Sequence, residues 1–255
     1  MRAAARLTVF LLHALGGSAR SFDLVRARLP GVETVALDLP GFGGAVDADR
    51  FAVADMAAGV IAAVAERAPE RWMLVGHSMG GKVAAAVARA AADGDAPAGL
   101  AGLAGLVLLA ASPPAPEPMA ERRRADMLGW VAAGPIGDRD ARAFVDANTA
   151  QTLPVAVGAA AAADVRRSSR RAWAAWLEHG SREDWRARVG VLPYPALIVA
   201  GAEDGDLGED AQRRLNVPHY ADARVEVVAG AAHLLPLEAP DAIAALIRRW
   251  WARGQ

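Results

Sequence analysis

The sequence predicts an α/β protein with a mostly parallel sheet of about six strands, helices on both faces and a helical cap. Three observations indicate this fold class. Short apolar segments end in Gly-rich or polar turns, helical stretches lie between them, and one long region has no strand signal. A chain of 255 residues is long enough for one large domain with a substantial core.

Most of the predicted strands are short, largely apolar runs, as is typical of parallel strands buried on both faces. They are Leu7 to Leu12, Thr34 to Leu37, Trp72 to Val75, Leu103 to Ala110, Ala196 to Ala200 and Arg224 to Val228. The predicted helices are Phe22 to Leu29, Val53 to Arg67, the Ala-rich Met79 to Ala91 and the final Ile243 to Trp251. This alternation favours a parallel sheet, because parallel neighbours need a crossover that is usually helical.

The alternation stops between Ser112 and about Leu192. A stiff Pro-rich segment, Pro113 to Pro118, opens this region and disfavours helix, and tryptophan-bearing helical material follows. We expect a cap of residues 113–190 inserted into a core of residues 1–112 and 191–255. Two compatible interpretations remain: the helices bury their own aromatic residues, or they form a lid over an apolar pocket. The candidate pocket residues there are Trp130, Trp173 and Trp176.

Composition excludes several function classes. The formal net charge is −1, with 54% hydrophobic and 22% charged residues, so no strong field attracts nucleic acid or an anionic membrane. We interpret the abundant Arg side chains as a solvated surface, with Arg122 to Arg124 and Arg166 to Arg171 as the alternative contacts for an anionic partner. The absence of Cys excludes disulfides, thiolate catalysis and Cys-based metal sites, and it suits a cytoplasmic protein.

The N-terminus superficially resembles a signal peptide, because Arg2 and Arg6 precede the apolar run Leu7 to Leu12. The run is short and passes directly into the segment His13 to Gly17, so cleavage would remove a core strand. We therefore reject a signal peptide and expect a cytoplasmic protein. No segment reaches the roughly 18 unbroken apolar residues of a membrane span.

The strongest catalytic signal is Val75-Gly76-His77-Ser78-Met79-Gly80-Gly81. A predicted strand runs into Ser78, and a helix of small residues follows it. In the pattern G-x-S-x-G the serine occupies a strained strand-to-helix turn, and the glycines avoid collisions with neighbouring backbone. Ser78 is therefore the predicted nucleophile.

A serine hydroxyl needs a base to take its proton. The five histidines are His13, His77, His179, His219 and His233. His233 is the predicted base, because it follows a late strand, where a parallel sheet places its functional groups. His77 adjoins the serine and is expected to point away from it, and His13 either orders the loop after the first strand or contacts substrate.

The base must itself be oriented by a carboxylate. Asp204 is the predicted acid, because it follows the apolar strand Ala196 to Ala200 in Gly201-Ala202-Glu203-Asp204. Asp206 is its main rival. The same acidic loop also holds Glu203, Glu209 and Asp210.

An oxyanion needs preorganised donors. The backbone N–H of Met79, just after the nucleophile, is one predicted donor. The backbone N–H of Leu15, in the turn-forming loop before Gly16 and Gly17, is the other.

Together these motifs resemble the α/β-hydrolase superfamily. They are Leu12-His13-Ala14-Leu15-Gly16-Gly17, Asp38-Leu39-Pro40-Gly41-Phe42-Gly43, Gly76-His77-Ser78-Met79-Gly80-Gly81, Gly201-x-x-Asp204 and His233-x-x-x-x-Glu238-x-Pro240. The chain is similar to the compact esterase, non-haem haloperoxidase-like and acyl-carrier methyl-ester hydrolase branches. The resemblance implies the α/β-hydrolase fold, the order Ser…Asp…His, and a helical cap between the sixth and seventh conserved strands.

Two residues and the N-terminus depart from the family pattern. Ala14 stands where Gly is usual after the His, and Gly44 stands where Ser is usual after the D-x-P-G-x-G turn. The chain also leaves little room for the antiparallel strands that often open this fold, so we expect a sheet of about six strands.

The predicted activity is hydrolysis of an ester, a thioester or an amide of a small to medium, partly apolar substrate, through an acyl-enzyme on Ser78. No metal or organic cofactor is expected. Acyl transfer, carbon–carbon bond hydrolysis and perhydrolysis remain alternatives on the same scaffold, as does a receptor-like binding module.

Overall fold

The computed structural model describes residues 7–94 and 100–252 of the chain. Its centre is a six-stranded, wholly parallel sheet with the order β2-β1-β3-β4-β5-β6. The strands are β1 Leu7–Leu12, β2 Glu33–Leu37, β3 Arg71–His77, β4 Leu103–Leu109, β5 Ala196–Gly201 and β6 Ala223–Val228. The predicted fold class and the expected strand number are therefore confirmed.

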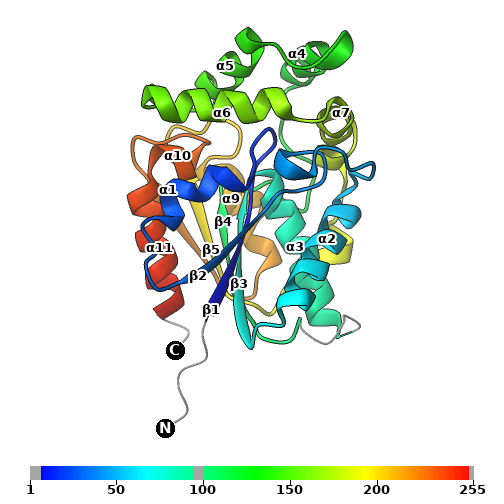
Figure 1. Ribbon diagram of the computed structural model, residues 1–255. Coiled ribbons are helices and arrows are strands. Elements are labelled where there is room, and N and C mark those ends of the chain that lie inside the picture. The colour runs from blue at the N-terminus through cyan, green and yellow to red at the C-terminus, as the bar shows by residue number, and fades with distance from the viewer. Residues whose placement is uncertain (1–6, 95–99, 253–255) are drawn as a thin grey trace.

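Helices connect the strands and cover both faces of the sheet (Figure 1). They are α1 Asp23–Arg26, α2 Val53–Arg67, α3 Met79–Asp93, α4 Glu121–Ala132, α5 Asp138–Asp146, α6 Val155–Arg167, α7 Arg170–Glu178, α8 Arg186–Val189, α9 Glu209–Leu215, α10 Leu235–Glu238 and α11 Pro240–Ala252. Short 3-10 turns occur at η1 Ala19–Phe22, η2 Gly43–Ala45, η3 Gly180–Arg182 and η4 Val217–His219.

The central strands supply two hydrophobic cores, one on each face of the sheet. In β1, Val9 and Leu11 join the core under α1 and α11, whereas Phe10 and Leu12 join the core under α2 and α3. This separation follows from the two-residue period of a strand, and it explains why β1 is buried at every position. The edge strand β6 instead contains only partly buried and exposed residues.

The segment between β4 and β5 is fully described and contains helices α4 to α8 but no strand. Figure 1 shows α4, α5, α6 and α7 lying beyond one end of the sheet. These helices bury aromatic residues of their own: the Trp173 ring lies 5.2 Å from Phe144 and 6.2 Å from Trp130, measured between ring centroids.

One predicted helix is shorter than expected. The segment Phe22 to Leu29 forms the end of η1 and the four-residue α1. The N–H groups of Arg28 and Leu29 donate to carbonyls three residues back, and Pro30 follows, which disfavours a helical conformation for the preceding residue. Arg2 and Arg6 lie outside the described residues, and within those residues no helix is both long and apolar enough to cross a bilayer.

Candidate active site

Ser78 sits at a tight turn between β3 and α3. Its backbone has φ 49° and ψ −118°, a positive φ that is uncommon for a non-glycine residue. A Cβ on Gly76 would lie 2.5 Å from the Gly80 carbonyl oxygen, and one on Gly80 would lie 2.4 Å from the Leu12 carbonyl oxygen. Both positions therefore require glycine, as the motif predicts, and the turn holds the serine at the end of the sheet.

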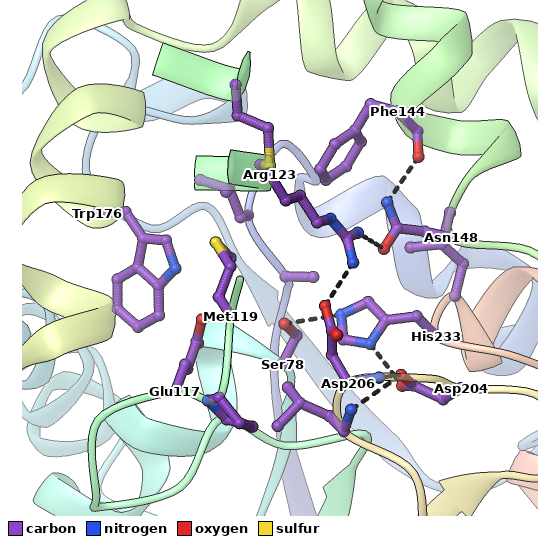
Figure 2. Close-up of a pocket in the computed structure, with 16 residues that line it drawn as sticks. Ser78, Glu117, Met119, Arg123, Phe144, Asn148, Trp176, Asp204, Asp206 and His233 are labelled. Atoms are coloured by element: carbon purple, nitrogen blue, oxygen red, sulfur yellow. Dashed lines mark hydrogen bonds and ion pairs between the residues drawn. The ribbon is translucent and has the colours of Figure 1, made fainter. Parts of the chain in front are cut away.

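His233 connects Ser78 to a carboxylate. Its Nε2 lies 2.9 Å from Ser78 Oγ, and its Nδ1 lies 2.8 Å from Asp204 Oδ2 (Figure 2). An ionised carboxylate only accepts hydrogen bonds, so Nδ1 carries the proton and Nε2 is free to accept the serine hydroxyl proton. The structure thus brings the three predicted catalytic residues into one hydrogen-bonded chain.

The other Asp204 oxygen is also occupied. Oδ1 accepts hydrogen bonds from the backbone N–H groups of Asp206, at 3.1 Å, and Leu207, at 3.0 Å. Burial opposes ionisation of Asp204, but the hydrogen bond and charge of His233, with these N–H donors, outweigh it and lower the pKa of the carboxyl. The rival Asp206 instead accepts from Arg123 Nη1 at 2.5 Å, and His233 pairs with Asp204 rather than with Asp206.

The loop that carries His233 is fixed from two directions. The N–H groups of His233 and Leu234 both donate to the Asn148 carbonyl oxygen, at 3.1 and 3.0 Å. His77 Nε2 lies 2.7 Å from the His233 carbonyl oxygen, so Nε2 carries the proton and donates. Burial, then the nearby His233, lowers the pKa of His77 to about 3, so its ring is neutral. The His77 ring therefore donates a hydrogen bond to the backbone of His233, the predicted base.

The two predicted oxyanion donors border the nucleophile. Leu15 lines the pocket beside Ser78, and Met79 is the first residue of α3. In the described part of the chain, neither residue's N–H donates a loop, cap or side-chain hydrogen bond. Within the described residues, neither N–H is therefore occupied by a protein acceptor of these kinds, and the oxyanion role stays a prediction.

His13 orders the loop before Leu15 and does not line the pocket. Its Nδ1–H donates to the Ala14 carbonyl oxygen at 2.7 Å, and its Nε2 accepts from the Leu39 N–H at 3.0 Å. Burial lowers the pKa of the ring, which favours this neutral state. His13 thus joins the loops that follow β1 and β2.

A pocket opens at Ser78 between the sheet and the α4–α7 helices. Its apolar walls include Leu15, Met119, Met127, Phe144, Trp176 and Leu207, and its polar residues include Glu117, Arg123, Asn148 and Asp206. Trp176 is the one predicted tryptophan that lines this pocket, whereas Trp130 and Trp173 pack against Phe144 and do not line it. Trp173 points its Nε1–H at the Met127 carbonyl oxygen, 3.0 Å away.

Sequence reasoning missed Glu117, Arg123 and Asn148. Glu117 lies in the Pro-rich segment, where we considered only chain stiffness, and Arg123 belongs to a stretch that we interpreted as solvated. That interpretation is wrong for the neighbouring Arg124, which is 3% exposed. Its guanidinium donates to the Leu177 carbonyl oxygen and, at 2.6 Å, to Ser181 Oγ, which compensates for lost water.

Comparison with known proteins places these features in a family. The sequence model of the alpha/beta hydrolase family matches residues 9–246. A segment of 73 residues is 34% identical to the 2-succinyl-6-hydroxy-2,4-cyclohexadiene-1-carboxylate synthase of Serratia proteamaculans (strain 568), and this match spans 29% of this chain and 29% of that relative.

Two solved structures show the same fold. An esterase from Exiguobacterium antarcticum matches with a TM-score of 0.83 at 16% identity, over 97% of this chain and 92% of that one. A bromoperoxidase from Bacillus anthracis matches with a TM-score of 0.81 at 16% identity, over 98% and 92% of the two chains. The names of the three proteins describe different reactions, so similarity alone does not select one.

Proposed function

This chain belongs to the alpha/beta hydrolase family, and from that premise we propose that it is a serine hydrolase that cleaves esters through an acyl-enzyme on Ser78. The observation that carries the proposal is the continuous hydrogen-bonded chain from Ser78 Oγ through His233 to Asp204. Such a chain supplies a nucleophile, a base and an orienting carboxylate, the three groups that acyl transfer to serine requires.

In the first half-reaction, His233 Nε2 takes the proton of Ser78 Oγ as that oxygen attacks the substrate carbonyl carbon. The carbonyl oxygen becomes an oxyanion, which the N–H groups of Leu15 and Met79 stabilise. The tetrahedral intermediate then collapses, His233 donates its proton to the leaving alcohol, and the acyl group remains on Ser78. Asp204 stabilises the imidazolium that forms transiently and holds the Nδ1–H tautomer.

In the second half-reaction, His233 takes a proton from water, and the resulting oxygen nucleophile attacks the acyl-enzyme carbonyl. Collapse of this second intermediate breaks the bond to Ser78 Oγ, which recovers its proton from His233. One water molecule is consumed, and the products are a carboxylic acid and an alcohol.

The pocket walls support a small to medium, partly apolar substrate. Met119, Met127, Phe144 and Trp176 come from the segment between β4 and β5, so we assign to residues 113–190 the role of a cap that completes the pocket. A thioester or an amide fits the same chemistry, because the attacked atom is again a carbonyl carbon.

Multiple-turnover hydrolysis of neutral para-nitrophenyl esters of graded acyl length tests the proposal. The wild type should release both products continuously, and Ser78→Ala should reduce the rate to background. A single slow event that leaves the protein modified would instead indicate a receptor-like module. Product formed only after addition of an acceptor alcohol or hydrogen peroxide would indicate acyl transfer or perhydrolysis.

A further inference from the structure

The pocket contains a carboxyl group that the catalytic steps do not use. Glu117 follows β4 in the Pro-rich segment and is partly buried against the pocket. In Figure 2 its carboxyl lies beside Met119, on the opposite side of Ser78 from Asp204. It therefore faces the space that a substrate bound at Ser78 occupies.

Both the backbone and the side chain of Glu117 are held. Its N–H donates to the Ser181 carbonyl oxygen at 2.8 Å, and its Oε1 accepts a hydrogen bond from Ser112 Oγ. Across the described ranges, its second oxygen, Oε2, makes no hydrogen bond or ion pair. One oxygen thus fixes the carboxyl, and the other is left for a ligand.

The single lysine of the chain supports a negative charge at this position. Lys82 is 1% exposed, and its ammonium donates to the carbonyl oxygens of Gly180 at 3.2 Å, Ser181 at 3.4 Å and Glu183 at 3.0 Å. Burial raises the pKa of Glu117, and the positive charge of Lys82 is the main influence that opposes this rise. A buried ammonium bound to neutral carbonyls is stabilised by a nearby carboxylate.

The other charges that line the pocket are already compensated. Arg123 is paired with Asp206, and Asp204 is paired with His233. Glu117 is therefore the lining carboxylate, within the described residues, that has no cation at ion-pair distance. A second carboxylate brought by a substrate would meet this charge without a free cation to receive it.

We propose that Glu117 is a specificity-determining residue that selects esters bearing a hydroxyl or ammonium group and disfavours esters bearing a carboxylate. The donor group of the substrate binds Oε2 while its ester carbonyl lies at Ser78. This assignment rests on the proposed function and narrows its substrate class. A carboxylate-bearing substrate has no hydrogen-bond donor for Oε2, and its charge repels the Glu117 carboxylate. Both effects weaken its binding.

The test uses two series of esters. In the first, para-nitrophenyl hexanoates carry a methyl, hydroxyl, ammonium or carboxylate group at the end of the acyl chain. In the second, the same groups are placed on the alcohol part of the ester. We expect the wild type to show kcat/KM about tenfold higher for the ammonium ester than for the carboxylate ester in at least one series. Glu117→Gln retains the acceptor for Ser112 and should remove most of this difference. Glu121→Gln is the matched control, because it removes an exposed carboxylate close by in the sequence that does not line the pocket.

A measurement on the wild type alone keeps the proposal testable if Glu117→Gln does not fold. Protonation of Glu117 at low pH should lower the ratio of ammonium-ester to methyl-ester kcat/KM, and any effect of pH that is common to both esters cancels in that ratio. The charged groups that influence Glu117 from the packed elements are Lys82, His233 and Arg124.

Equal kcat/KM for ammonium and carboxylate esters in both series would overturn the assignment, as would a preference that Glu117→Gln leaves unchanged. An equal loss for every ester in Glu117→Gln would also overturn it, because that pattern belongs to a structural role. Hydrolysis of the methyl-terminated ester that Ser78→Ala abolishes is the separate test of the proposed function. The two failures are therefore distinguishable.

Discussion

The sheet side and the helical side of the pocket differ in what fixes their residues. On the sheet side, Ser78, Asp204 and His233 follow β3, β5 and β6, and backbone hydrogen bonds hold the loops that carry them. On the helical side, Arg123 and Trp176 project from α4 and α7, and side-chain packing and side-chain hydrogen bonds position them. The positions of the candidate catalytic residues therefore depend on backbone geometry. The shape and charge of the pocket depend instead on the side chains of the α4–α7 helices, which lie outside those loops.

Two of the contacts that join the sides lie next to the candidate catalytic residues. The Asn148 carbonyl oxygen accepts the N–H groups of His233 and Leu234, and Arg123 pairs with Asp206 in the loop that holds Asp204. Substitutions on the sheet side should consequently abolish reaction or folding, and those on the helical side should mainly change substrate preference.

The two aspartates of one loop give the largest expected contrast. Asp204→Asn removes the group that orients His233, and we expect kcat to fall by about 10⁴-fold. Asp206→Asn removes only the partner of Arg123, and we expect less than about a tenfold change in kcat. Steady-state kinetics on a neutral ester measures both, and similar losses would show that the carboxylate assignment is incorrect.

Replacing one helical glycine on each side should change the free energy of unfolding in opposite directions. Gly80→Ala places a Cβ 2.4 Å from the Leu12 carbonyl oxygen, and we expect a loss of about 3 kcal/mol in the free energy of unfolding. Gly129→Ala in α4 meets nothing within 4 Å, so we expect a gain of about 0.5 kcal/mol from helix propensity. Urea denaturation measures both changes, and equal stabilities would contradict the close packing of the turn.

Acid should lower the free energy of unfolding, because His77 on the sheet side is buried in its neutral form. Its folded-state pKa is lowered from 6.5 to about 3, so between these pH values the unfolded chain binds the proton and the folded chain does not. Stability is therefore lost as pH falls below 6.5, by about 2 kcal/mol at pH 5. In His77→Gln, whose amide donates to the same carbonyl, denaturation should show a smaller acid loss. An unchanged pH dependence would mean that other groups cause it.

The smallest effect is expected from two tryptophans of the helical side. Trp176→Phe enlarges the pocket and should raise kcat/KM for a longer acyl chain relative to a short one by about threefold. Trp130→Phe alters the packing behind Phe144 and should leave this ratio unchanged. The graded ester panel measures both ratios. A ratio that changes in Trp130→Phe but not in Trp176→Phe would show that Trp130, and not Trp176, contacts the acyl chain.

The difference between the sheet side and the helical side also explains which features could be predicted from the sequence. The strands and the three candidate catalytic residues were accessible because glycine spacing and apolar runs report backbone geometry, as at Gly76 and Gly80. The pocket composition was not accessible. Glu117 and Arg123 acquire their roles from contacts between distant segments, and neither has a local pattern that distinguishes it from a solvated residue. Trp176 lines the pocket, whereas Trp130 and Trp173, which carry the same composition signal, do not line it.

The most direct test of the central claim is labelling with a fluorophosphonate, followed by intact mass and peptide mapping. The account predicts one adduct on Ser78 in the wild type, none in Ser78→Ala, and much slower labelling in His233→Ala, because the imidazole activates the hydroxyl. A folded wild type without an adduct at Ser78, or one labelled no faster than His233→Ala, would contradict the activated nucleophile on which the proposed activity depends.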